Sequence, residues 1–478
     1  IKPVLFRTPL VVPKWSHTAP ICPPLGLAYV AASLKRAGYD VRCVDALGEA
    51  PLQRIATEDN KYLYYGLSIK EILQHLAFKE FNVLFVSLMF SHDWPMTKSF
   101  IKTIKKIYPE VTMVCGGEHI SACPKFSMED CPEIDICVLG EGEETSIDIL
   151  KTIEQKKSLS KVNGIVYRSG EEIIINPKRS RISQLDDIPL PAWDLFPLEN
   201  YLSNNLGYGV NPGRTMPMLI SRGCPFQCTF CSSPQMWTTK WQARDPDCVI
   251  EEMQFYIDKY KATNFDFYDL TAIVRKDWII KFCQKIIKKN WNITWQMPSG
   301  TRSEALDDET LGLMMLSGQK HISYAPESAS KTTLQKIKKK IKVENMKKSI
   351  RSALSKGMSV KLNLMLGFPD ETHKEMLETL RFVLDAAFMG VSDVYLASFA
   401  PYPGSELFDQ MYKNGQIPKL DDEYFLNLTS YTDLLHSYSY SRHVGHHMLS
   451  VYRIGGMSMF YILNFVLRPK RIFRLFRN

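Results

Sequence analysis

Several features that mark other protein classes are missing from this chain of 478 residues. No cysteine follows Cys283 and the total of eleven is odd, so we expect no secreted disulfide framework. No apolar run reaches the roughly 18 residues that a membrane-spanning helix needs. No G-x-G-x-x-G pattern follows the first expected strand, which leaves a dinucleotide site unsupported. A reducing cytosol fits this cysteine usage, and we expect a cytoplasmic protein.

Charge and the N-terminal segment narrow the partners and the location further. The net charge of +8 is mild for this length, so we expect no nucleic-acid partner. The opening residues IKPVLFRTPLVV lead into a proline-rich loop instead of a small-residue cleavage site, so we expect no signal peptide. Because the first residue is not methionine, we expect a trimmed or incomplete N-terminus.

What is present is the composition and periodicity of a globular α/β protein. With 45% hydrophobic and 23% charged residues the chain can form sizeable cores, and its length suits about three domains. Residues 1–155 alternate strand-like and helix-like segments, and the strand-like ones, such as 81–90 and 112–117, are almost continuously apolar. That pattern predicts a Rossmann-like domain whose parallel sheet is covered by helices on both faces.

The alternation of strand-like and helix-like segments stops after this domain and then resumes. Residues 156–205 read as a linker, with a hairpin turning at Ser169 and Gly170 and then a proline-rich extended stretch. Residues 206–405 contain about six β/α units, which predict a (β/α)6-type partial TIM barrel. Residues 406–478 are expected to form a mostly helical C-terminal region with a basic amphipathic end.

A loop with three cysteines is the most informative motif. The stretch SRGCPFQCTFCSSP sets Cys224, Cys228 and Cys231 at the spacing C-x3-C-x2-C, at the end of an expected barrel strand. Soft thiolates bind iron–sulfur clusters or zinc. Three thiolates would leave one iron of a four-iron cluster without a protein ligand and open to a small molecule. The alternatives are a zinc loop with a remote fourth ligand and three unrelated thiols.

With aromatic Phe230 just before the last cysteine, this loop resembles the signature of the radical S-adenosylmethionine enzymes. The resemblance implies that Cys224, Cys228 and Cys231 hold a [4Fe-4S] cluster whose open iron is chelated by S-adenosylmethionine. Electron transfer then cleaves that molecule to methionine and a 5′-deoxyadenosyl radical. It also implies that Phe230 lies against the adenine. A low-potential electron donor such as flavodoxin or ferredoxin is expected as a partner.

The stretch APESAS (325–330) resembles a second motif of these enzymes. The resemblance implies that Glu327 and Ser328 contact the ribose or the methionine end of S-adenosylmethionine. Ala325 and Pro326 replace the usual glycine-rich lead, which departs from the family pattern in the backbone contacts.

Two further stretches resemble the family in the expected order, LMLGFPDET (364–372) and APYPGSELF (400–408). The first implies that Gly367 and Pro369 pack near the adenine. Four more residues stand at expected strand ends and are weaker candidates for contacts with S-adenosylmethionine or substrate. They are Tyr268, Asp269, Arg302 and Tyr324.

Small-residue turns follow several strands of the N-terminal domain. Such turns let a backbone approach a flat or bulky ligand closely, although they also occur as tight turns with no ligand. Together with PPLGLAYVAASLKRAGYDV they resemble the cobalamin-binding domain that is fused to many radical enzymes. The resemblance implies cofactor contacts at Ser87, Ser91, Gly116, Gly117, Glu118, His119, Gly140, Glu141 and Gly142.

One departure concerns the ligand of cobalt. Domains of the methionine-synthase type supply a histidine through D-x-H-x-x-G, whereas here Asp45 is followed by Ala46 and Leu47. This resembles the subclass in which cobalt has no histidine ligand from the protein. His92 and His119 lie near the expected binding face, where we interpret them as polar filling and not as ligands.

The whole arrangement resembles the cobalamin-dependent radical S-adenosylmethionine proteins over residues 1 to about 410. Many of these are methylases, so the resemblance implies transfer of a methyl group from methylcobalamin to an unactivated carbon of a small-molecule or lipid-like substrate. The substrate would lie at the junction of the two domains. Two alternatives stay open, an oxidative cyclase or ring-rearranging enzyme and a cobalamin-binding sensor without catalysis.

The C-terminal region allows two interpretations. Between Arg453 and Arg468 lie 14 uncharged, mostly apolar residues, too few to span a bilayer. The basic residues that follow alternate with apolar ones, which is compatible with peripheral contact to an anionic membrane. The alternative is a helix packed on the barrel with a solvated basic end. Polar, solvated faces are expected for the lysine-rich 336–342 and for His443, His446 and His447; the basic end comprises Arg468, Lys470, Arg471, Arg474 and Arg477.

Overall fold

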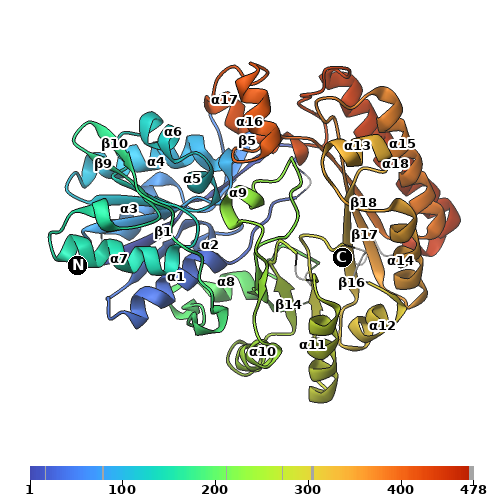
Figure 1. Ribbon diagram of the computed structural model, residues 1–478, viewed down its shortest axis with the longest axis horizontal. Helices are drawn as coiled ribbons and strands as arrows, with labels where there is room; N and C mark the ends of the chain where they lie inside the picture. Colours follow the sequence, from blue (N-terminus) through green and yellow to red (C-terminus); the bar gives the residue numbers. More distant parts are fainter. Residues whose placement is uncertain (17, 78–79, 211–212, 272, 303–305, 473–478) are drawn as a thin grey trace.

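The computed structural model shows an N-terminal sheet domain and a barrel side by side, joined by a C-terminal region that contacts both (Figure 1). It describes residues 1–16, 18–77, 80–210, 213–271, 273–302 and 306–472. Within these residues, none of the helices combines the length and the apolarity that crossing a bilayer requires.

The N-terminal domain contains a seven-stranded sheet in the order β10-β9-β8-β7-β6-β1-β3. Five neighbouring strands of this sheet run parallel, namely β8, β7, β6, β1 and β3. Their carboxyl ends therefore lie along one edge. Alternate residues of β1 enter two different cores, Leu5 one and Phe6 the other, so both faces are covered. The strands are β1 (Pro3–Arg7), β3 (Arg42–Asp45), β6 (Val83–Ser87), β7 (Thr112–Gly116), β8 (Ile136–Val138), β9 (Ile165–Ser169) and β10 (Glu172–Ile175).

Helices cover this sheet as the apolar strands predict. Helices α1 and α7 pack together on one face, while α3 and α4 supply the core of the other. The helices of the domain are α1 (Leu25–Arg36), α2 (Ala46–Glu49), α3 (Ile69–Ala77), α4 (Trp94–Ile107), α5 (Glu118–Ala122), α6 (Pro124–Asp130) and α7 (Gly142–Glu154).

The hairpin β9–β10 corrects the predicted linker. It does not stand between domains but extends the N-terminal sheet, because β9 pairs antiparallel with the open edge of β8 and buries Ile165 and Val166 completely. Only the later part of 156–205 is extended, ending in α8 (Leu198–Ser203). A small antiparallel sheet that the sequence pattern did not predict comprises β2 (Leu10–Pro13), β4 (Arg54–Ala56) and β5 (Tyr62–Tyr65).

The barrel has six parallel strands in chain order, which confirms the predicted partial barrel. They form two ladders of three, β11-β14-β15 and β16-β17-β18, joined by one bridge between Thr301 and Tyr324. The strands are β11 (Thr215–Met218), β14 (Asn264–Phe267), β15 (Thr294–Gln296), β16 (His321–Glu327), β17 (Ser359–Leu366) and β18 (Asp393–Ser398). The helices between them are α10 (Pro246–Tyr260), α11 (Lys276–Lys289), α12 (Asp308–Leu316), α13 (Lys331–Lys336), α14 (Val343–Ser355) and α15 (His373–Met389).

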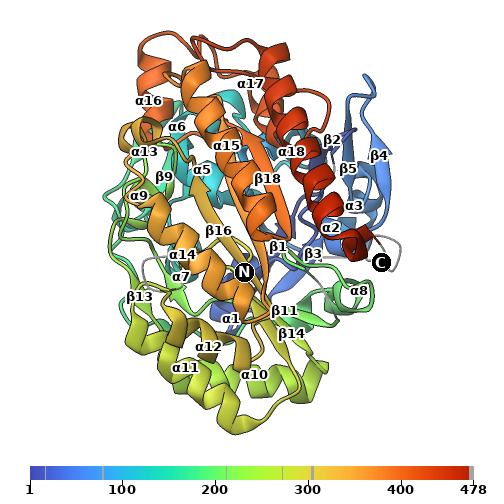
Figure 2. The ribbon, with the colours of Figure 1, turned by 90° about the vertical axis from the view of Figure 1, so that its right-hand side faces the viewer.

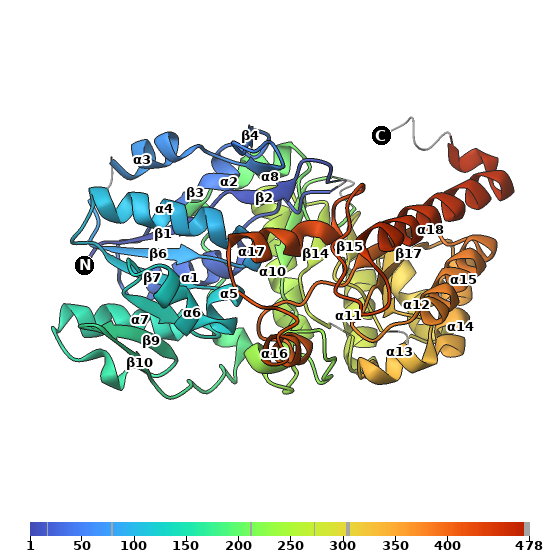
Figure 3. The same cartoon turned by 90° about the horizontal axis from the view of Figure 1, so that it is seen from above.

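The C-terminal region is helical, as predicted, and it contacts both domains. Helix α16 (Glu406–Lys413) leads to α17 (Asp422–Asn427), which packs against α4 of the N-terminal domain. Helix α18 (His446–Leu467) lies along α15 and β18 on the outer side of the barrel (Figures 2 and 3). Of the basic end, Arg474 and Arg477 lie outside the described residues.

Candidate functional site

The three-cysteine loop starts from a short hairpin whose position a buried carboxylate fixes. Strands β12 (Ser221–Arg222) and β13 (Gln242–Ala243) pair at its base, and α9 (Ser233–Trp237) follows the last cysteine. Asp269, just after β14, accepts hydrogen bonds from the amide and the hydroxyl of Ser221, both at 2.5 Å. Burial raises the pKa of Asp269 to about 6. This predicted contact residue therefore positions the start of the loop.

The thiols of the loop are free and desolvated. Cys228 is buried, Cys224 and Cys231 are half-buried, and none forms a disulfide. Burial raises the pKa of all three thiols, that of Cys231 to about 12. A metal bound to sulfur deprotonates a thiol outright, so such groups suit a metal ligand better than a free nucleophile.

The loop is not preformed around a single ion. Among the described residues, no three His, Cys, Asp or Glu side chains gather closely enough to hold one metal ion. A four-iron cluster does not require such a gathering, because its cysteine ligands bind different irons. A donor set of three thiols without a fourth ligand therefore fits a cluster with one open corner.

Two cations lie beside the cysteines. The Lys339 ammonium donates a hydrogen bond to Glu327 at 2.9 Å, and its side chain is only 9% exposed. The Arg302 guanidinium lies 3.5 Å from the centre of the Phe226 ring. Both positive charges act against the effect of burial on the pKa of Cys228. The site therefore offers positive charge next to the thiols.

Lys339 corrects the prediction of a wholly solvated lysine-rich segment. Its neighbours Lys336 and Lys338 are exposed, but Lys339 points inward and lies 5.9 Å from the Phe230 ring. Burial acts to lower its pKa, but the facing Glu327 carboxylate and Cys228 raise the pKa above its ordinary value. Lys339 is thus held as a cation, and local sequence pattern carries no signal that separates it from its neighbours.

The end of β16 is irregular where Glu327 stands. Its register against β17 shifts between Tyr324 and Glu327, and Glu327 has a φ of 66° in the left-handed region. A residue other than glycine is uncommon there, and such strain concentrates at functional sites. The conformation turns the Glu327 carboxylate toward Lys339.

Two predicted contact residues on this side point elsewhere. Ser328 is fully buried, and its hydroxyl is 2.9 Å from that of Thr379 on α15, so it ties the loop to that helix and is not open to a ligand. Tyr324 is buried as well, with its hydroxyl 2.8 Å from Ser349 on α14. Both hydroxyls are thus used within the fold, and contact of either residue with a ligand stays a prediction.

The segment after β17 meets the cysteine loop through aromatic rings. Phe368 lies 6.0 Å from Phe230 and 5.1 Å from Phe399, between ring centres. The predicted residues Gly367 and Pro369 flank this ring and are buried, and a Cβ on Gly367 would come within 2.9 Å of Leu449 on α18. Phe230 thus joins a cluster of tilted aromatic rings at the strand ends.

A buried carboxyl holds this segment in shape. Glu371 accepts hydrogen bonds from the backbone amides of Gly367 at 2.8 Å and Phe368 at 3.3 Å. Burial raises its pKa to about 7, more than these amides lower it. Glu371 is a residue that the motif contained but that sequence reasoning did not single out.

The raised pKa of Glu371 makes stability depend on pH. The folded protein holds this proton more tightly than the unfolded chain, so the stabilising contribution is full below pH 4.5 and is lost as pH rises to about 7. We expect the free energy of unfolding of wild type, relative to Glu371→Gln, to fall by about 3 kcal/mol across this window. Unfolding by urea at a series of pH values measures it, and a constant difference between the two proteins would contradict the assignment.

The strand ends of the N-terminal sheet form a second surface. Ser87 and Gly116 are half-buried at the ends of β6 and β7, and Met89 in the next loop is 60% exposed. Gly117 has a φ of 107°, and a Cβ there would come within 2.2 Å of the Leu88 carbonyl oxygen. A Cβ at Gly140 would meet open space. This edge of the sheet therefore carries few large side chains and is partly apolar, which fits a large flat ligand.

The histidines of this surface are buried inside the domain. His119 is 0% exposed, stacks on Trp94 and has Ser91 within hydrogen-bond distance, and burial lowers its pKa to about 3. The side chains of Ser91 and His119 therefore fill the core, and contact of either residue with a cofactor stays a prediction. His92 is also buried, and its Nδ1 has no hydrogen-bond partner among the described residues. The complete burial of His119 agrees with the interpretation of this residue as polar filling.

The acidic residues of the strand-end turns reach across to the cysteine loop. Glu118 accepts a hydrogen bond at 2.5 Å from Ser232, the residue after Cys231, and burial raises the pKa of this carboxyl. Arg222, just before the loop, pairs with Glu141 at 3.0 Å and with Glu143 at 2.5 Å. Glu118 and Glu141 were predicted as cofactor contacts, and the structure uses both to join the two domains.

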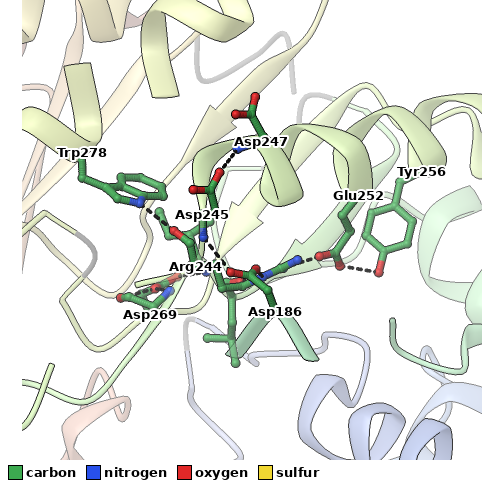
Figure 4. Close-up of polar contacts among 11 residues, drawn as sticks. Asp186, Arg244, Asp245, Asp247, Glu252, Tyr256, Asp269 and Trp278 are labelled. Carbon is green, nitrogen blue, oxygen red and sulfur yellow. Dashed lines mark hydrogen bonds and ion pairs between the residues drawn. The ribbon is translucent and has the colours of Figure 1, made fainter. Parts of the chain in front are cut away.

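A second arginine secures the other side of the hairpin. Arg244 follows β13 and pairs with Asp186 of the extended segment at 3.0 Å and with Glu252 of α10 (Figure 4). Glu252 also accepts a hydrogen bond from Tyr256 at 2.7 Å. Because Arg222 and Arg244 flank the hairpin, the cysteine loop is anchored to the N-terminal domain, the connecting segment and the barrel together.

Sequence analysis missed a buried polar cluster between the N-terminal sheet and α8, which consists of Arg7, Tyr201 and Asp45. Arg7, at the end of β1, donates to Tyr201 at 2.9 Å, and the Tyr201 hydroxyl donates to Asp45 at 2.7 Å. Asp45 also caps α2 through the Gly48 amide. Asp45 therefore has a structural use, which accounts for an acidic residue that no histidine follows.

Comparison with known proteins identifies both domains. A family model described as B12 binding domain matches residues 16–150, and one described as Radical SAM superfamily matches residues 218–383. A cytidylyl-2-hydroxyethylphosphonate methyltransferase of Streptomyces wedmorensis is 30% identical over 434 residues, which cover 84% of this chain and 80% of that protein. The chain belongs to the cobalamin-dependent radical SAM enzymes. The cofactors of this family are cobalamin, a [4Fe-4S] cluster and S-adenosylmethionine, as the sequence motifs predict.

Other relatives of this radical SAM enzyme carry different names. An uncharacterised methyltransferase of Pyrococcus horikoshii is 28% identical over 392 residues, covering 82% of this chain and 79% of that one. An anaerobic magnesium-protoporphyrin IX monomethyl ester cyclase of Rubrivivax gelatinosus is 25% identical over 413 residues, covering 85% and 70%. The fold matches the radical S-adenosylmethionine methyltransferase TsrM of Kitasatospora setae, with cobalamin and [4Fe-4S] cluster bound, at a TM-score of 0.67, 15% identity and coverage of 87% and 78%.

Proposed function

We propose that this enzyme methylates an unactivated carbon of a small molecule at the junction of its two domains. The observation that carries the proposal is the direct tie between the strand-end turns of the cobalamin-binding domain and the cysteine loop, through Glu118 with Ser232 and through Arg222 with Glu141. Such a tie sets the distance between two cofactor sites that must act on one substrate. Two relatives named methyltransferases support the same reaction.

Each part of the site has a proposed role. When bound, the cluster and S-adenosylmethionine supply a radical that removes a hydrogen atom from the substrate, and cobalamin supplies the methyl group. Cys224, Cys228 and Cys231 hold the cluster. Phe230 and the ring of Phe368 form a wall for the adenine, with Gly367 and Pro369 beside it.

The charged groups orient S-adenosylmethionine in this proposal. Lys339 holds the Glu327 carboxylate at the ribose or methionine end, and Arg302 adds a second positive charge near the thiols. In the cobalamin-binding domain, the low-side-chain edge at Ser87, Gly116, Gly117, Gly140 and Gly142 receives the corrin or its tail.

We propose that the substrate space lies at the junction of the domains, beside Tyr208. Tyr208 keeps 47% of its surface accessible. Its ring lies 6.0 Å from that of Tyr268. We propose a small-molecule substrate for this space. A cytosolic flavodoxin or ferredoxin as reductant fits the eleven free thiols.

Isotope transfer tests the proposed reaction. The reconstituted enzyme, with reduced flavodoxin and a cellular metabolite extract, is incubated with methyl-labelled S-adenosylmethionine, and Cys228→Ala serves as the matched control. We expect a labelled product that the control does not form. A changed product without label would contradict methyl transfer and would favour an oxidative cyclase, the second candidate, which the Rubrivivax relative supports.

A further inference from the structure

Helix α18 buries polar side chains as well as apolar ones such as Leu449 and Phe460, and it leaves many apolar side chains exposed. A helix on a water-soluble protein turns apolar residues inward and charged ones outward. Here the inward face includes Arg453 and Asn464, which are 2% and 1% exposed. Arg453 donates hydrogen bonds to the carbonyl oxygens of Leu396 and Tyr431, both at 2.9 Å, and Asn464 donates to that of Val391 at 2.7 Å. Polar groups therefore dock this helix onto the barrel.

Most exposed side chains of α18 between Met448 and Leu467 are apolar. Val466 is 72% exposed and Ile462 is 61% exposed, and no exposed side chain between His447 and Arg468 carries a charge. From Met448 to Val466 these side chains recur three to five positions apart, close to the spacing of one helix face. We call these residues the α18 face; its members are Met448, Val451, Ile454, Met459, Ile462, Val466 and Leu467.

The neighbouring helix continues this surface. Helix α15 packs along α18, with His373 2.8 Å from the Tyr452 hydroxyl, and it leaves Leu377 and Phe388 exposed. Helices α15 and α18 lie side by side on the outer side of the barrel, away from the N-terminal sheet (Figures 2 and 3). An apolar helix face exposed in this way marks an interaction site.

The charge of the C-terminal region indicates which kind of partner the α18 face contacts. From Leu434 to Asn478 the sequence contains seven basic residues and no aspartate or glutamate. Arg468 and Arg471 donate hydrogen bonds to carbonyl oxygens at the end of α15, those of Ala387 and Gly390. An apolar helix face followed by basic residues, in a segment without acidic residues, is complementary to a bilayer surface that contains anionic lipids.

We propose that the α18 face lies on an anionic membrane surface, with the helix in the plane of the headgroups. The apolar side chains enter the boundary with the acyl chains, while Arg453 and Asn464 stay attached to the barrel. The proposal places membrane contact on the outer face of the helix, while Arg468 and Arg471 cap α15. The inference does not depend on which reaction the enzyme catalyses.

Vesicle binding by the full-length holoprotein tests the proposal. The probe is sedimentation with vesicles of phosphatidylcholine containing about 30% phosphatidylglycerol, compared with pure phosphatidylcholine. We expect wild type to bind the anionic vesicles more tightly than the neutral ones. The double variant Ile462→Glu, Val466→Glu should bind at least about tenfold more weakly, because it places charge in the apolar boundary. Both positions are exposed, so the variant should fold.

A matched variant controls for the added charge. Leu316 on α12 is 75% exposed, and Leu316→Glu should bind vesicles like wild type. Unchanged 5′-deoxyadenosine formation in both variants shows that the fold is intact. No vesicle binding by wild type, or equal binding by the double variant, would overturn the proposal. Concentration-dependent self-association that the double variant loses, without vesicle binding, would overturn it in favour of a second copy covering the face.

Discussion

The Cys228→Ala variant is expected to lose its iron–sulfur cluster and with it all cleavage of S-adenosylmethionine. Cys228 is one of three thiols in a loop with no fourth cysteine, so two ligands cannot hold the cluster while one iron stays open. Anaerobic incubation with a low-potential reductant should then yield 5′-deoxyadenosine only at the background level. The measurement is the rate of 5′-deoxyadenosine formation together with the absorbance of the cluster.

Another cysteine controls for removal of a thiol as such. Cys248 is a half-buried free thiol on α10, outside the loop, and Cys248→Ala should keep the cluster and the activity. If Cys228→Ala retained both cluster and cleavage, the assignment of the loop as the cluster site would be wrong. A sensor without catalysis would show no cleavage in wild type either.

Replacement of Lys339 by methionine should have the second-largest effect. The methionine has similar length but no charge, so the Glu327 carboxylate loses its partner in a space that is nearly closed to water. A hydrogen bond between charged groups contributes about 1.5–3 kcal/mol, so we expect the half-saturating concentration of S-adenosylmethionine to rise about 10–100-fold. The rate of 5′-deoxyadenosine formation as a function of S-adenosylmethionine concentration measures this.

The neighbouring Lys338 provides the matched control. Its side chain is 49% exposed and pairs with Glu406, so Lys338→Met should leave the half-saturating concentration unchanged. If Lys339→Met and Lys338→Met both behaved like wild type, Lys339 would have no role at the cofactor. A loss of maximal rate without a change in half-saturation would place its effect on the cluster instead.

The sequence predicted the features that short-range chemistry determines. The spacing of Cys224, Cys228 and Cys231 carries the cluster site because three ligands in one short loop depend little on the rest of the fold. The apolar runs of the N-terminal strands likewise predicted a sheet buried on both faces, since each residue such as Leu5 or Phe6 enters one of two cores.

Features that depend on long-range packing could not be predicted in the same way. Lys339 stands in a run of lysines, and only the fold of β16 brings Glu327 beside it. His119 and Ser328 belong to motifs, yet tertiary contacts with Trp94 and Thr379 turn their side chains into the core. The hairpin after residue 156 looked independent because its partner, the open edge of β8, cannot be identified from local pattern.

Helix α18 shows the same limit from the other direction. Its composition is apolar, so a hydrophobic pattern alone favours burial of the apolar side. Arg453 nevertheless turns inward, where it donates hydrogen bonds to the carbonyl oxygens of Leu396 and Tyr431. No local rule weighs these carbonyl partners, which come from β18 and the segment after α17.

The central claim is that one chain holds cobalamin and an iron–sulfur cluster at the junction of its domains. The most direct test is the iron and cobalt content of the full chain, purified anaerobically from cells supplied with cobalamin. The account predicts about four iron atoms and about one cobalt atom per chain. Zinc in place of iron, or protein that retains iron but no cobalt, would contradict it.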